Sequence, residues 1–92
     1  MNPEQLEAVA GFRQAVFKIL TCLPVGPPGR MQEMRGWLVE FESASIPASR
    51  LRAIALSLRG QAVELARQTE PAALPEAARQ LIDAADAVLV AF

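Results

Sequence analysis

The 92-residue chain contains no histidine, a single cysteine and a single lysine. Without histidine it lacks the commonest metal ligand and the commonest general base. One cysteine, Cys22, excludes an intramolecular disulfide and a cysteine-based metal cluster, and its position at the end of an apolar segment indicates a small core residue rather than a redox site. We therefore expect no catalytic residues, no metal and no cofactor.

Long apolar runs are missing as well. No segment approaches the roughly 20 consecutive apolar residues of a membrane span, and the N-terminal MNPEQLEAVAGF lacks the basic and apolar regions of a signal peptide. A net charge of −1 provides no general attraction to nucleic acid or to anionic lipid. We expect a cytoplasmic protein, and the preference for alanine and for arginine over lysine indicates a bacterial or phage origin.

Helical spacing dominates the rest of the chain, and no alternation typical of a strand is found. Proline- and glycine-containing breaks (LPVGPPGR, SASIP and TEPAALP) separate the helical segments. The predicted helices cover approximately residues 3–22, 30–43, 47–68 and 75–90. Four helices with short connections predict one all-α domain, a mostly antiparallel four-helix bundle.

Residues that favour helix starts set these boundaries. Asn2 is a good N-cap, and Gln5 completes a spacing that resembles a capping box. Pro47 and Pro75 are expected to occupy the first position of the third and fourth helices, where the missing amide hydrogen has no cost.

The first predicted helix is apolar around most of its circumference. Leu6, Phe17 and Leu20 lie outside its narrow polar stripe, so the helix is either central to the bundle or packed on both the bundle and a second chain. Arg13 lies among these apolar residues. It either extends along a bundle edge with its charge in water or forms a buried or interfacial pair with a carboxylate. A chain this short has a thin core, which also favours an oligomer.

The fourth predicted helix is amphipathic, with an apolar face that continues through the C-terminal VLVAF. We expect this terminal segment to be packed. Arg79 and Asp83, four residues apart on the polar face, are expected to form a weak pair. The inward-facing residues are predicted to be Ala78, Leu81, Ile82, Ala85, Val88, Leu89 and Phe92.

The third predicted helix carries four arginines and divides into three sectors. Its core seam is predicted to be Leu51, Ile54, Ala55, Leu58, Ala62 and Leu65. Ser57, Gln61, Glu64 and Gln68 are placed on the solvated side with Arg50. The remaining sector, called the arginine flank below, comprises Arg52, Leu56, Arg59, Val63 and Arg67. Arginine among aliphatic residues is typical of protein interfaces, but such a flank also covers neighbouring helices with its arginine stems.

Taken together, these patterns predict a non-enzymatic protein–protein interaction module of the adaptor, assembly-factor, chaperone or inhibitor type. It would be homo-oligomeric or bound to a protein partner, and would use the apolar face of the first helix and the arginine flank. Arg13 is a further candidate contact, as is Trp37, which is either a core residue or an interface hot spot.

The alternative is a small helical nucleic-acid-binding regulator. The second and third predicted helices imitate a helix-turn-helix, but the turn lacks the usual glycine and the start of the third helix lacks asparagine and glutamine. Nucleic acid is therefore the less favoured partner.

Overall fold

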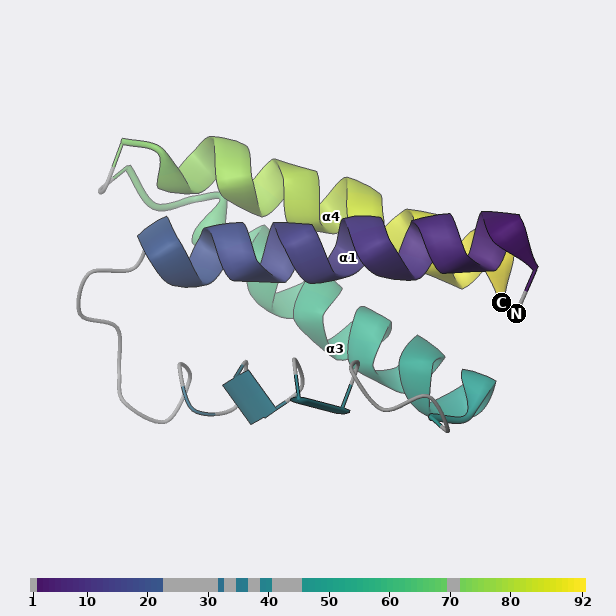
Figure 1. The fold of residues 1–92 in the computed structure, drawn as a ribbon. Coiled ribbons are helices and arrows are strands. Elements are labelled where there is room, and N and C mark those ends of the chain that lie inside the picture. The colour runs from purple at the N-terminus through teal and green to yellow at the C-terminus, as the bar shows by residue number, and fades with distance from the viewer. Residues whose placement is uncertain (1, 23–31, 33–34, 37–38, 41–45, 70–71) are drawn as a thin grey trace.

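A computed structural model describes residues 2–22, 32, 35–36, 39–40, 46–69 and 72–92. Regular structure in this part of the chain is entirely α-helical, as predicted from the spacing of the apolar residues. Three helices are assigned within it: α1 (Pro3–Cys22), α3 (Ala48–Leu65) and α4 (Leu74–Ala91) (Figure 1).

The predicted four-helix bundle is not supported, because only three helices are found in the described ranges. Most of the predicted helix over 30–43, including Trp37, lies outside these ranges. Its described residues, which have helical backbone, are Gln32, Arg35, Gly36, Val39 and Glu40. The three assigned helices already enclose a core, because alanines at positions 77, 78 and 85 of α4 leave room for α1 and α3 to pack against it.

The core consists of apolar residues from all three helices. Its buried members are Phe12, Ala15, Val16, Ile19, Leu51, Ile54, Ala55, Leu58, Ala62, Leu65, Leu74, Ala77, Ala78, Leu81, Ala85 and Val88. The six predicted seam residues of the third helix are all among them. Within the described ranges α4, rather than α1, is the central helix, since both α1 and α3 pack on it. Leu89 and Phe92 are half-buried against the same core while Val90 is 84% exposed, so the apolar C-terminus is packed only on one side.

Both packed pairs of helices are antiparallel. At one end of the molecule, the side chain of Gln5 donates a hydrogen bond of 3.0 Å to the carbonyl of Ala91, which joins the start of α1 to the end of α4. Near the same end, Arg52 from the start of α3 donates to the carbonyl of Leu89. The N- and C-termini consequently lie side by side (Figure 1).

The helix ends agree with the predicted capping residues, with small shifts. The Gln5 amide donates to Asn2 Oδ1 at 2.8 Å, and the Asn2 amide donates to Gln5 Oε1 at 3.1 Å, which is a reciprocal capping box. Pro47 is the N-cap of α3 and not its first helical residue. Its ψ of 151° is extended, yet its carbonyl accepts hydrogen bonds from the helix. Pro75 is the second residue of α4, which begins at Leu74.

The third helix is shorter than predicted, ending at Leu65 rather than at 68. Beyond it the amides of Arg67 and Gln68 bond to carbonyls three residues earlier. This tightening is common where a helix ends, because the last carbonyls have no amide partner four residues on.

Candidate functional site

The arginine flank of α3 is turned partly toward α4. Arg52 Nη1 donates a hydrogen bond of 2.7 Å to the carbonyl of Leu89. This carbonyl lies in the last turn of α4, where backbone acceptors lack intrahelical donors and a cation is favourable. Arg52 therefore caps the C-terminal end of the central helix.

Arg59 makes the second contact from the flank to α4. Its Nε lies 2.7 Å from Asp86 Oδ1, and the two side chains are 42% and 49% exposed. An ion pair this accessible to solvent is worth about 0–1 kcal/mol. The pair orients the arginine along α4, but either group can exchange it for a partner at small cost.

The rest of the flank is less engaged within the chain. Leu56 is 58% exposed, Val63 is half-buried and Arg67 is exposed. Arg52 and Arg59 thus contact the neighbouring helix α4, as one of the two interpretations of the flank predicts, while Leu56 and Arg67 still face solvent.

Arg50, placed by the sequence on the solvated side of the third helix, forms a two-pronged ion pair with Glu40. Its Nε and Nη2 each donate to one carboxylate oxygen of Glu40 at 2.9 Å. These hydrogen bonds, helped by the charge of the guanidinium, lower the pKa of Glu40 below its ordinary value. The same pairing raises the pKa of Arg50.

An apolar stripe follows the outer side of α1. Leu6 is 57% exposed and Phe17 is 63% exposed, with Ala10 and Arg13 also exposed between them. We call these four residues the α1 stripe. Arg13 is exposed because its helix turns this side away from the core, which fits the expectation that its charge lies in water and not the alternative of burial inside the bundle. A pairing of Arg13 across an interface stays a prediction.

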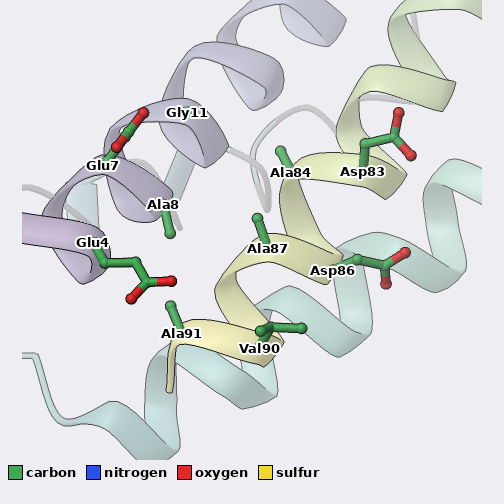
Figure 2. A pocket seen from close by; sticks show the side chains of 10 residues that line it. All are labelled: Glu4, Glu7, Ala8, Gly11, Asp83, Ala84, Asp86, Ala87, Val90 and Ala91. Atoms are coloured by element: carbon green, nitrogen blue, oxygen red, sulfur yellow. The ribbon is translucent and has the colours of Figure 1, made fainter.

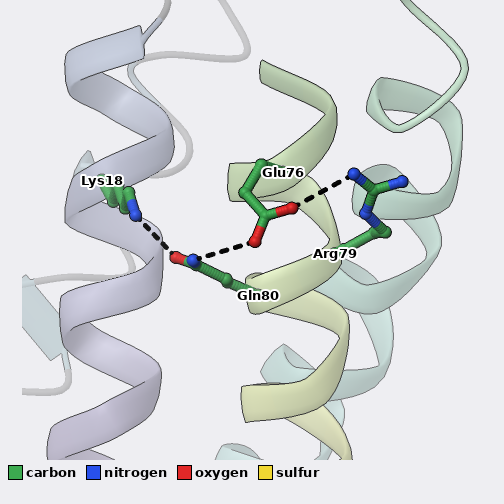
Figure 3. Close-up of polar contacts among 4 residues, drawn as sticks. All are labelled: Lys18, Glu76, Arg79 and Gln80. Carbon is green, nitrogen blue, oxygen red and sulfur yellow. Dashed lines mark hydrogen bonds and ion pairs between the residues drawn. The ribbon is translucent and has the colours of Figure 1, made fainter. Parts of the chain in front are cut away.

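A chain of polar contacts links α1 to α4 on another side (Figure 3). Lys18 Nζ donates to Gln80 Oε1 at 2.8 Å, and the Gln80 amide donates to Glu76 at 3.4 Å. Arg79 pairs with the same Glu76 at 3.1 Å, not with Asp83 as predicted. An acid N-terminal to a base is the more favourable order on a helix, which explains the choice.

A groove runs beside these contacts, between the first half of α1 and the second half of α4 (Figure 2). It measures about 630 Å³ and is called the α1–α4 groove below. Its lining residues are Glu4, Glu7, Ala8, Gly11, Asp83, Ala84, Asp86, Ala87, Val90 and Ala91. In Figure 2 the side chains of Ala8, Ala87 and Ala91 turn into the space between the helices and the Glu4 carboxylate reaches toward Ala91, whereas Asp83 and Asp86 point outward from α4, away from α1. This groove was not predicted from the sequence, although small and acidic residues recur there at helical spacing.

No protein-family model, curated protein or solved structure matches this chain. Among the residues described, no group of histidine, cysteine and acidic side chains is arranged to hold a metal ion. Among the helices of the described ranges, none is both long enough and apolar enough to cross a membrane. The surfaces above are therefore the observations from which function can be argued.

Proposed function

We propose that this chain is a non-enzymatic protein–protein interaction module whose main contact surface is the α1 stripe. The observation that carries the proposal is the exposure of Leu6 and Phe17 on one side of α1. Single exposed apolar residues are ordinary, but these two belong to one stripe, and apolar stripes mark contact sites.

The spacing of the stripe favours a helical partner. Its residues lie at positions 6, 10, 13 and 17, and the intervals of four, three and four residues are those of a coiled-coil seam. Arg13 lies between Ala10 and Phe17 in this seam. A partner helix would come from a second copy of the chain or from a partner protein of the adaptor, assembly-factor or chaperone type.

The energy available from the stripe is moderate. Full burial of a leucine or phenylalanine contributes about 1.5–3 kcal/mol, and each of these side chains has somewhat more than half of its surface left to bury. The two together would supply roughly 2–4 kcal/mol, which is the contribution of a small interface anchor.

The nucleic-acid alternative has less support. Arg52 and Arg59 bind acceptors on α4, and Arg50 binds Glu40, so three of the four arginines of the third helix already have acceptors within the chain. Salt dependence would test this alternative, because the affinity of a phosphate-binding surface falls steeply with salt, and by a similar factor for nucleic acids of unrelated sequence.

The test combines molar mass in solution with affinity capture from the native host. Leu6→Ser with Phe17→Ser should dissociate an oligomer or abolish capture of the partner while leaving the thermal unfolding temperature nearly unchanged. Val39→Ser, which alters an aliphatic residue that is 69% exposed elsewhere, is the matched control. A wild-type chain that is monomeric at every concentration, and that captures the same proteins as the double variant, would contradict the proposal.

A further inference from the structure

The α1–α4 groove is a second surface with its own chemistry. Its floor is built from Ala8, Gly11, Ala84 and Ala87. A Cβ atom added to Gly11 would meet nothing within 4 Å, so the space above this backbone is empty. Small side chains let helices approach closely, because the distance between packed helices is set by the residues at the contact. The groove therefore has room for a third helix lying along α1 and α4.

The edges of the groove are acidic. In the described part of the chain, Glu4, Glu7 and Asp83 form no hydrogen bond or ion pair through their carboxylates, and Asp86 shares its charge with Arg59. Val90, 84% exposed, adds an apolar wall beside them. An apolar floor between rows of carboxylates is complementary to an apolar stripe between rows of cations.

The charge changes along the groove. Beyond Gly11 the space continues past Gln14 to Lys18, which is bonded to Gln80 across the two helices (Figure 3). The acidic portion extends from Glu4 to Gly11 on α1. Seven residues at 1.5 Å each make this about 10 Å, or two helical turns. An occupant would thus meet acidic groups over two turns and a cation at the far end.

We propose that the α1–α4 groove binds a basic amphipathic helix of a partner protein. The bound face presents small apolar side chains over about two turns, and lysine or arginine on both sides reaches the carboxylates of the groove. The inference rests on the proposed role as an interaction module, but concerns a separate surface. At 100° per residue, Gly11 lies about 140° around α1 from Leu6 of the α1 stripe.

The probe for this test is a fluorescent 18-residue synthetic peptide, helical by design, with alanine and leucine in one stripe and lysine on both sides of it. One control peptide replaces every lysine with glutamate, and another has the same composition with the stripe permuted. Fluorescence anisotropy should show binding of the first peptide alone, weakened by added salt. Amide shifts in the NMR spectrum should concentrate at Gly11, Ala84 and Ala87.

Two sets of variants separate shape from charge. Gly11→Leu fills the floor and should weaken binding at least about tenfold. Gly60→Leu, made at another mid-helix glycine with nothing within 4 Å, is the matched control and should bind as the wild type does. The combination of Glu4→Gln, Glu7→Gln and Asp83→Asn should cost about tenfold and remove most of the salt dependence.

Each contrary result overturns the inference. Equal affinity of the permuted peptide would mean that charge alone is recognised, and equal affinity of Gly11→Leu would place binding elsewhere. A fall in molar mass on Gly11→Leu without peptide would identify the occupant as a second copy of the chain. Phe17→Ser should leave peptide affinity unchanged. The proposal for the α1 stripe and the proposal for the groove can therefore be refuted independently.

Discussion

Gly11 and Gly60 lie in the middle of α1 and α3, and a side chain added at either position would contact nothing within 4 Å. Glycine in a helix interior is about 0.8–1.0 kcal/mol less favourable than alanine. Since no neighbour would be displaced, Gly11→Ala and Gly60→Ala should each recover most of that amount. The two sites lie on different helices and share no neighbour, so the double variant should gain roughly 1.6–2 kcal/mol.

For a chain of this size, 1 kcal/mol corresponds to a rise of about 4–8 °C in melting temperature. Circular dichroism during heating and during urea titration measures both quantities, and the urea slope should stay constant because the surface exposed on unfolding hardly changes. A loss of stability in Gly11→Ala would refute the reasoning, since it would require a neighbour within contact distance of a site that the structure leaves open.

Two further predictions concern the core and pH. Leu81→Ala, at a fully buried position of α4, should cost about 2–5 kcal/mol in urea titration, whereas Leu56→Ala should stay within about 0.5 kcal/mol because that side chain is 58% exposed; equal losses would show that Leu56 is buried. Because Arg50 lowers the pKa of Glu40, their pairing should add stability above pH 4.5, the ordinary pKa of Glu40, and lose it as the pH falls. The small stability difference between wild type and Glu40→Gln should therefore shrink as the pH falls below 4.5, and a difference that does not change with pH would contradict this cause.

The helical faces were predictable because they depend on periodicity alone. The spacing of apolar residues placed the seam of α3 from Leu51 to Leu65, and the same reasoning identified the buried side of α4. Capping followed equally from local chemistry, since the capping box of Asn2 and Gln5 involves residues three apart. Such features need no knowledge of how the helices are arranged.

The contacts between helices were not predictable in this way. A helical wheel shows that Arg52 and Arg59 share one side, but not that the carbonyl of Leu89 and the carboxylate of Asp86 lie opposite them. The groove was missed for the same reason, because its two walls come from opposite ends of the chain. The seam residues could be predicted, while the surfaces available to a partner depend on the crossing of α1 and α3 over α4.

The apolar residues of α1 fall into two groups, those that the fold buries and those that it leaves exposed. The packing of this helix on α4 is supplied by Phe12, Ala15, Val16 and Ile19, all buried. Leu6 and Phe17 contribute little to that core, and polar residues in their place would make the isolated chain more soluble at almost no cost in stability. Packing among the described helices therefore does not require the stripe, which supports the proposal that it binds a partner helix.

The open space at Gly11 does not by itself show that the α1–α4 groove is a binding surface. Gly60 carries the same helical penalty on α3, away from the groove, and is just as open. What distinguishes Gly11 is its setting between the alanine floor and the acidic edges, where three carboxylates lack partners in the described part of the chain. Only an occupant of opposite charge would contact the small floor and the acidic edges together. Comparing peptide binding by Gly11→Leu and Gly60→Leu therefore tests whether the groove is a binding surface.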